Sequence, residues 1–332
     1  MPRPRLHEAT IHLPARRFDD AVIAPVTIPD GVNDITIDVA GRDVKLTNLG
    51  KVFWAETGYT KRDLLQYYSD ISPWLLGHIH DRAMVMKRFV HGADGEFFFM
   101  KRTPSPRPDW LETCSVVHNP ENTIEFPVIQ DLPSLLWVVN LGCIDLNQWY
   151  ARVDDVDTPD YLHFDLDPVP DAGFDKVRQA ALVVRDGLAE KGIPSYIKTS
   201  GSDGMHLYIP IVRGTHQKAV WTFAKAFAIE IAAKFPDLLT SEYKIADRPP
   251  GRILVDYNQN AWGRTLASIY SVRPTPTATV STPVRWEEVE AGVEATAFNL
   301  KNVPARVSEI GDLWSPVLPE SADRVELDKY LF

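Results

Sequence analysis

The chain has 332 residues, of which 45% are hydrophobic and 24% charged, and its formal net charge is −10. These fractions are typical of a folded protein of about two domains at ~150 residues each, and they exclude collagen-like, disordered and disulfide-scaffold classes. The longest apolar stretch, residues 135–144, is far shorter than the ~20 residues of a membrane span, and no apolar run follows the N-terminal arginines as in a secretory signal. Two cysteines without CxxC spacing indicate neither a disulfide framework nor a zinc site, so we expect a reducing cytoplasm.

Charge is distributed unevenly along the sequence. Residues 1–110 carry 15 Lys and Arg against 14 Asp and Glu, whereas the other 222 residues carry 20 against 31. Between Arg82 and Trp110, six basic residues accompany three acidic ones. The net charge disfavours nucleic-acid binding over the whole surface, but this basic stretch is compatible with contact to a phosphate backbone at one place.

The first half of the chain predicts an N-terminal lobe over residues 36–150, preceded by a proline-dotted extension over residues 1–35. Alternating apolar and polar residues predict strands, and apolar residues at helical spacing predict a helix. The expected elements are a hairpin over 35–46 that turns at Gly41, a helix opened by Thr60, and strands over 83–88 and 96–101.

Residues 151–285 alternate strand and helix patterns, which predicts an α+β lobe with helices on one face of a sheet and the other face free for a site. The expected elements are a strand over 161–166, a helix over 174–191, strands over 195–199 and 205–211, a helix over 215–235 with Thr215 as N-cap, and strands over 252–257 and 265–272. Residues 286–332 have few strand signals and are expected to form a small helical cap.

Three aspartates on the expected strands form a candidate metal site. Asp165 and Asp167 are two residues apart in YLHFDLDP, so a strand places both on one face, and Asp256 lies in the apolar strand of RILVDYNQN. An exposed strand end is a simpler explanation of the first pair alone, but an aspartate inside an apolar strand needs a partner. Together the carboxylates fit the oxygen ligands of Mg²⁺ or Mn²⁺, and they leave nucleotidyl transfer, nuclease and glycosidase chemistry open.

The segment TSGSDGMHLYIP adds a candidate phosphate site. Its turn combines glycines with Ser200 and Ser202, which present backbone N–H groups and hydroxyls of the kind that bind phosphate. His206 follows on the next expected strand and could donate to a phosphate oxygen. Such a turn alone often only joins two strands, but a turn, a strand histidine and three carboxylates together are much less common.

Eight segments then occur in order from about Val44 to Trp286: LTNLGKVFW, GYTKRDLLQYY, MKRFVHGADGEFFFMKR, YLHFDLDP, TSGSDGMHLYIP, ILVDYNQN, IYSVRP and TPVRWEE. Together they resemble the polymerase domain of bacterial ligase D, the branch of the archaeo-eukaryotic primase superfamily that serves non-homologous end joining. The resemblance implies an α+β primase-polymerase core, with an RRM-like catalytic lobe packed on an N-terminal α/β lobe. Ligase D usually also has ligase and nuclease domains, so we expect either a stand-alone polymerase or an excised domain.

The resemblance also implies roles for individual residues. Asp165, Asp167 and Asp256 would hold two divalent ions, Mn²⁺ or Mg²⁺. The residues expected to bind the NTP or dNTP are Ser200, Ser202, His206, Lys87, Arg88, Arg248 and Arg273. Lys51 and Lys61 would bind the 5′-phosphate of a recessed DNA end, and Phe98 and Phe99 would stack on template bases. Without the resemblance, residues 97–99 would be interpreted as a buried strand and the two lysines as solvated.

The expected activity is addition of nucleotides, preferably ribonucleotides, to DNA 3′ ends in double-strand break repair. Two alternatives are a primase of the same superfamily that starts strands de novo and a catalytically weak module that bridges DNA ends; a nuclease is a third. Expected partners are 5′-phosphorylated gaps or overhangs, Ku and a DNA ligase, with no membrane, in a cytoplasmic, nucleoid-associated setting.

Three positions depart from the family pattern. Gly50 stands where relatives often have an acid, and Asn147 stands where they often have a histidine. Asp203 replaces the lysine of the family's SGSKG turn, which places a negative charge near the expected triphosphate. The last departure puts nucleotide affinity in question and leaves the expected metal chemistry in place.

Overall fold

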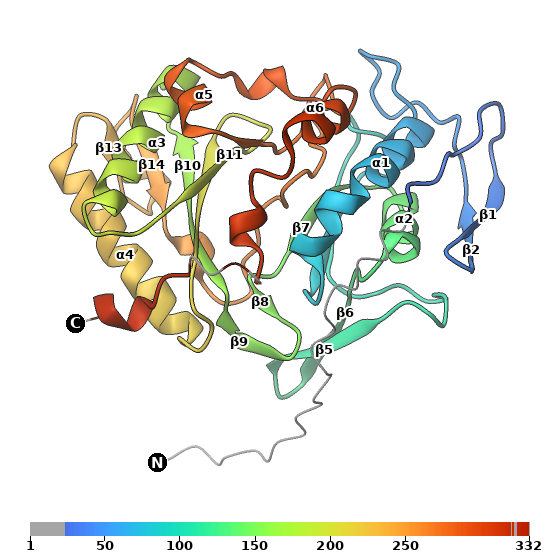
Figure 1. Cartoon of the computed structure of the whole chain (residues 1–332), viewed down its shortest axis with the longest axis horizontal. Helices are drawn as coiled ribbons and strands as arrows, with labels where there is room; N and C mark the ends of the chain where they lie inside the picture. The colour runs from blue at the N-terminus through green and yellow to red at the C-terminus, as the bar shows by residue number, and fades with distance from the viewer. Residues whose placement is uncertain (1–23, 320, 322–323, 332) are drawn as a thin grey trace.

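The computed structural model describes residues 24–319, 321 and 324–331, and Figure 1 shows them as two lobes side by side. Most of the predicted N-terminal extension, residues 1–23, lies outside the described residues. Residues 24–34 have no regular secondary structure but pack on the first helix, where Ile28 is fully buried and its N–H donates to Gln66 Oε1 at 2.8 Å.

In the part of the chain that the structure describes, the N-terminal lobe contains two hairpins, β1-β2 and β5-β6, two α-helices and a three-stranded sheet of order β4-β3-β7. Its elements are β1 (Ile35–Val39), β2 (Arg42–Leu46), α1 (Lys61–Ile79), β3 (Met84–Arg88), β4 (Phe98–Met100), β5 (Thr113–Asn119), β6 (Asn122–Pro127), α2 (Leu132–Asn140) and β7 (Cys143–Gln148). The predicted hairpin is confirmed, with Gly41 at a φ of +77° in its turn. The predicted helix start is confirmed as well, because Thr60 and Asp63 form a capping box.

The second lobe is built on a six-stranded sheet of order β13-β14-β10-β12-β11-β15. Its elements are β8 (Ala151–Arg152), β9 (Asp155–Pro159), β10 (Tyr161–Pro168), α3 (Phe174–Ala189), β11 (Tyr196–Thr199), β12 (Met205–Pro210), α4 (Gln217–Lys234), β13 (Leu239–Thr240), β14 (Ile253–Asp256) and β15 (Pro283–Val284). Beyond them lie α5 (Trp286–Glu290) and α6 (Val303–Ile310). In Figure 1, α5 and α6 lie along the upper side, and α6 approaches α1 of the other lobe.

Helices α3 and α4 cover one face of this sheet, as predicted (Figure 1). Alternate residues of β10 point to this face, and the ring of Phe164 lies 5.1 Å from that of Phe227 on α4. The two helices approach closely at Gly187, where a Cβ atom would come within 2.7 Å of Ile231 Cδ1. The opposite face, which carries the other residues of β10, therefore remains for a functional site.

Two local predictions are wrong. Residues 265–272 form no strand but an irregular connection between the lobes, because their N–H groups bond to separate segments: Ser268 N donates to Leu146 O and Tyr270 N to Ser281 O. The N-cap of α4 is His216 rather than Thr215, because the Thr215 hydroxyl donates to Asp328 at 2.9 Å and the His216 side chain accepts from Lys218 N.

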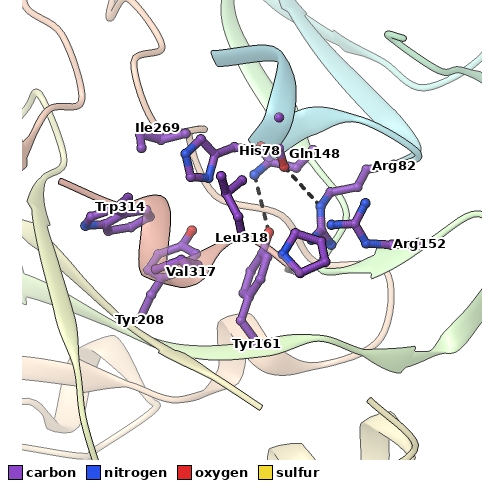
Figure 2. A pocket seen from close by; sticks show the side chains of 12 residues that line it. His78, Arg82, Gln148, Arg152, Tyr161, Tyr208, Ile269, Trp314, Val317 and Leu318 are labelled. Carbon is purple, nitrogen blue, oxygen red and sulfur yellow. Dashed lines mark hydrogen bonds between the residues drawn. The ribbon is translucent and has the colours of Figure 1, made fainter. Parts of the chain in front are cut away.

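A buried ion pair joins the two lobes. Arg82 lies just after α1, and Asp160 lies immediately before β10. One guanidinium nitrogen of Arg82 donates to both carboxylate oxygens of Asp160, at 2.7 and 2.8 Å. Arg152 donates to the same carboxylate at 2.9 Å. Beside the pair, Figure 2 shows Gln148 pointing to Tyr161, around a cavity of about 10 Å³ that has room for about one water molecule. These residues connect the two lobes, and the cavity between them is too small for a substrate.

None of the helices in the described part of the chain combines the length and the hydrophobicity that crossing a membrane requires.

Candidate active site and nucleic-acid interface

Four strands bring four chemically active side chains into one row on the open face of the large sheet. Asp256 on β14 is paired with Asp165 on β10, which is paired with His206 on β12, which is paired with Lys198 on β11. Residues directly opposite in an antiparallel pair share a face, so the four side chains lie on the same side of the sheet. They line or adjoin a cavity of about 430 Å³ between the lobes.

Nine of the fourteen predicted site residues line this cavity, and the other five do not. The lining set is Lys87, Phe99, Asp165, Asp167, Ser200, Ser202, His206, Arg248 and Arg273. Asp256 lies in the row beside Asp165, whereas Arg88, Phe98 and Lys51 lie partly or fully exposed on the N-terminal lobe. Lys61 is on the same lobe but is buried, at 5% exposed, so the interpretation of this lysine as solvated is wrong.

The carboxylates of the site oppose one another's ionisation. Asp165 is 5% exposed, and its Oδ1 accepts no hydrogen bond. Burial raises its pKa well above the usual value, and the charges of Asp167 and Asp256 raise it further. Partial desolvation and the Asp256 charge raise the pKa of Asp167 as well. A buried carboxylate oxygen without a donor, beside two further carboxylates, is the arrangement that a cation would stabilise.

The three carboxylates are not already closed around one point. Within the described residues, no three Asp, Glu, His or Cys side chains form a ready-made metal-binding group. Asp256 is held toward its own turn, where it accepts hydrogen bonds from Asn258 N at 2.7 Å and Gln259 Nε2 at 3.1 Å. The donor set therefore fits oxygen-preferring ions in its chemistry, and Asp256 would have to turn from these partners to take part.

The turn between β11 and β12 requires both of its glycines. Gly201 has a φ of +72°, and a Cβ atom on Gly204 would lie 2.6 Å from Leu166 O and 3.2 Å from Asp167 Oδ1. The Ser200 hydroxyl oxygen accepts from the N–H groups of Ser202 and Gly204, both at 3.1 Å, so its proton is left for another acceptor. This close approach brings the turn to the carboxylates, and Asp203 at its tip is exposed toward the cavity.

A buried aspartate that sequence reasoning missed organises the cations of the cavity. Asp145 on β7 is 1% exposed, and its Oδ2 lies 3.4 Å from Arg273 Nε and 4.0 Å from Lys87 Nζ. The Lys87 ammonium also lies 4.2 Å from the centre of the Phe97 ring. The signal that singled out Asp256, a carboxylate inside an apolar strand, was present here too in CIDLNQ.

An aromatic edge follows on the N-terminal lobe. Phe98 and Phe99 on β4 are 46% and 57% exposed, so the interpretation of this segment as a buried strand is wrong. The guanidinium carbon of Arg88 lies 5.2 Å from the centre of the Phe98 ring. Exposed rings beside cations provide a surface on which bases can stack.

Lys51 and Lys61 lie together next to this edge. Lys61 N donates to Lys51 O at 2.8 Å. The Lys61 ammonium donates to Thr47 O, and the Lys51 ammonium donates to Val90 O. Burial lowers the pKa of Lys61 to about 8, and the charges of Lys51 and Arg88 oppose protonation further, although Asp34 favours it. Three cations held near one another, one of them partly desolvated, fit an anionic group such as a phosphate.

The chain matches known proteins over most of its length. Residues 60–314 match the family model of the LigD primase-polymerase domain. The multifunctional non-homologous end joining protein LigD of Mycolicibacterium smegmatis is 31% identical over 276 residues, which cover 82% of this chain and 36% of that protein. The bifunctional LigD of Bacillus subtilis is 30% identical over 269 residues, which cover 81% of this chain and 43% of that protein.

A solved structure agrees. The polymerase domain of Mycobacterium tuberculosis ligase D, solved in complex with DNA, superposes with a TM-score of 0.78 at 29% identity and covers 84% of this chain and 99% of that one. The chain thus spans about two-fifths or less of the length of these curated LigD proteins, whereas it aligns with nearly all of the solved M. tuberculosis domain. It has the archaeo-eukaryotic primase fold that the sequence predicted, and it belongs to the LigD primase-polymerase domain family.

Proposed function

We propose that this protein is a metal-dependent nucleotidyltransferase that extends DNA 3′ ends during the repair of double-strand breaks by end joining. The observation that carries the proposal is the row Asp256–Asp165–His206, because it sets a buried carboxylate oxygen without a hydrogen-bond donor beside a second carboxylate, next to a cavity that the serine–glycine turn also lines. Family membership and the likeness to a ligase D polymerase domain that binds DNA support the same function.

The cavity provides separate groups for each part of the reaction. Two divalent ions, Mn²⁺ or Mg²⁺, would activate the primer 3′-hydroxyl and neutralise the triphosphate and the departing pyrophosphate. Asp165, Asp167 and Asp256 would hold these ions. The turn residues Ser200 and Ser202, with His206, would donate to the phosphate oxygens. Lys87, Arg248 and Arg273 line the same cavity and, with Arg88 on β3, would contact the triphosphate as cations.

The N-terminal lobe would position the DNA end. Phe98 and Phe99 would stack on template bases at the break, which requires no particular sequence because every base has a π-face. Lys51 and Lys61 would bind the 5′-phosphate on the far side of a gap. Such phosphate contacts position the substrate and do no chemistry.

The decisive experiment is primer extension on a 5′-phosphorylated gapped duplex with NTPs and Mn²⁺. The wild-type protein is expected to extend the primer, and a variant with Asp165→Ala and Asp167→Ala is expected to bind the same DNA without extending it. End binding with no extension by either protein would instead support the bridging module. A dinucleotide formed from two free nucleotides would support the primase, and shortening of the primer would support the nuclease.

The finer features of the proposal have their own tests. Ribonucleotide preference, which rests on the family resemblance, predicts a lower KM for NTPs than for dNTPs on the same primer. Ku and a DNA ligase are proposed partners. If either binds this chain, it should co-elute with the chain on a broken DNA duplex, and mismatched ends should be sealed faster when both proteins are present.

A further inference from the structure

Lys198 is a fully buried lysine beneath the nucleotide site, and the proposed chemistry assigns it no role. It lies on β11, opposite His206 in the register of β11 and β12. Its ammonium nitrogen lies 2.7 Å from His206 Nδ1 and 3.0 Å from Ala267 O, and it also contacts Ser281 Oγ. Burial and the charge of Arg273 lower the pKa of Lys198 well below its usual value, whereas the charges of Asp165 and Asp145 raise it. An ammonium at this position therefore depends on these carboxylates and on the acceptors around it.

The neighbours of Lys198 are matched to an ammonium with three N–H donors. Ala267 O can only accept, and Ser281 Oγ has committed its proton to Thr199 O at 2.9 Å, so it accepts from Lys198. These two acceptors take two of the three N–H groups. The third N–H then points to His206 Nδ1, which must accept and therefore carries no proton.

The alternative is a neutral Lys198 with the proton on His206 Nδ1, and Asp165, the next residue in the row, disfavours it. A neutral amine would use both of its N–H groups on Ala267 and Ser281, and it would accept a proton from His206 Nδ1. His206 Nε2 would then be a bare acceptor, 3.3 Å from the carboxylate oxygen Asp165 Oδ1. Asp165 has to be ionised to hold a cation, as the proposed function requires, and an ionised Asp165 would then face a second acceptor and repel it. A proton on Nε2 makes the same contact attractive.

We propose that Lys198 is a positioning residue that holds His206 in the tautomer with its proton on Nε2, the nitrogen that faces the carboxylate and the cavity. Nε2–H and Asp165 Oδ1 are not aligned for a hydrogen bond, so the donor remains for a phosphate oxygen of the nucleotide. The use of this donor for a phosphate oxygen rests on the proposed function, because it deepens the assignment of His206 to the triphosphate. Lys198 itself does not touch the substrate.

The tautomer can be measured without any activity. In ¹H–¹⁵N spectra of the full chain with ¹⁵N-labelled histidine, His206 is assigned among nine histidines by its absence in His206→Gln. The wild-type protein is expected to show the proton on Nε2, and Lys198→Met, which keeps the length of the side chain, is expected to lose this single tautomer. A wild-type proton on Nδ1 would overturn the proposal even if Lys198→Met does not fold, and so would an unchanged tautomer in a folded Lys198→Met.

Nucleotide binding supplies the second measurement. Lys198→Met is expected to raise the KM for NTP, and the Kd measured by calorimetry, by about tenfold, with kcat within about threefold, because a charge-assisted hydrogen bond to phosphate is lost. In a His206→Gln background, whose amide can donate without a tautomer, adding Lys198→Met should change Kd by less than about twofold. Equal losses in both backgrounds would show that Lys198 acts only on the fold.

A matched control is Lys176→Met, because Lys176 donates to Gly251 O at the opposite side of the sheet. It should leave both the tautomer and the NTP affinity unchanged. If the wild-type protein extends no primer but shows the Nε2 proton and its loss in Lys198→Met, the proposed function fails while the positioning role stands.

Discussion

Arg82 and Asp160 form a buried ion pair in which one guanidinium nitrogen contacts both carboxylate oxygens, at 2.7 and 2.8 Å, across the junction of the two lobes. Each side chain is about 4% exposed or less. Together with Arg152, the arginine charges hold the pKa of Asp160 at about 2, although burial acts in the opposite direction. The pair therefore links the relative position of the two lobes to the charge of one carboxylate.

The first prediction concerns acid stability. A carboxyl group whose pKa is about 2 in the folded protein and 3.8 in the unfolded chain stabilises the fold at neutral pH by roughly 2 kcal/mol. Because the folded pKa is the lower one, this contribution is complete above pH 4 and is lost as the pH falls toward 2. Asp160→Asn should lower the free energy of unfolding at pH 7 by about 3–5 kcal/mol, since it leaves Arg82 buried without its counter-charge.

Urea unfolding of the wild type and of Asp160→Asn at pH 7 and pH 3 measures this effect. The difference between their free energies of unfolding should be smaller at pH 3 than at pH 7. Asp154→Asn is the control, because Asp154 pairs with Arg213 at the surface and should contribute about 1 kcal/mol or less. A difference that stays constant with pH would mean that the charge of Asp160 is not what stabilises the junction of the two lobes.

Sequence patterns predicted the strands of the site but not their order. Alternation and turn residues located β10, β12 and β14, and the spacing of Asp165 and Asp167 placed both on one face. That Asp256 pairs with Asp165 depends on which strands are neighbours in the sheet, and such long-range pairing leaves no local signal. The sequence analysis grouped the three aspartates only because all are carboxylates on expected strands, and the family resemblance then gave them a shared role.

The site residues that the sequence analysis missed are buried charged side chains, whose burial depends on distant segments of the chain. Lys198 precedes a polar turn and looks solvated in sequence, yet it is fully buried because β15 and the connection through Ala267 cover it. Asp145 directly follows the apolar stretch 135–144, which the structure divides between α2 and β7. The strand expected over residues 265–272 failed for a related reason, since this segment is held by contacts with several distant elements rather than by one partner strand.

The second prediction concerns the third carboxylate. Asp256→Asn preserves size but removes a charge, so the site should lose affinity for at least one ion and extension should fall by at least about tenfold. DNA-end binding should persist. Asp247→Asn, an exposed aspartate in the short turn Ile245–Asp247, is the control and should leave extension unchanged. Extension at the wild-type rate by Asp256→Asn would remove this residue from the catalytic site.

The third prediction concerns the DNA end. Lys51→Ala with Lys61→Ala should abolish the preference for 5′-phosphorylated over 5′-hydroxyl gaps and should change extension of an open primer-template much less. Because the pKa of Lys61 is about 8, the wild-type preference should also weaken between pH 7 and pH 9 as the free lysine loses its proton. Lys45→Ala, an exposed lysine on β2, is the control. Equal losses on gapped and open substrates would show that the two lysines have only a general role.

The last prediction concerns Asp203, the position where this chain departs from its relatives. Its carboxylate is exposed at the tip of the turn, lines the cavity and raises the pKa of Asp167, so it adds negative charge where a triphosphate would bind. Asp203→Lys should therefore lower the KM for NTP, with kcat and the metal requirement unchanged, and Asp203→Asn should have a smaller effect in the same direction.

The salt dependence of the Asp203 variants separates repulsion from other roles. Exposed charges are screened over a Debye length of ~8–10 Å at physiological salt, so the difference in KM between Asp203→Lys and the wild type should shrink as salt is added. If Asp203 instead helps to hold an ion, Asp203→Lys will lower kcat at saturating nucleotide, and added salt will not restore it. If neither KM nor kcat changes, the turn does not approach the triphosphate, and the phosphate contacts proposed for Ser200 and Ser202 fail with it, because the same two glycines position all three side chains.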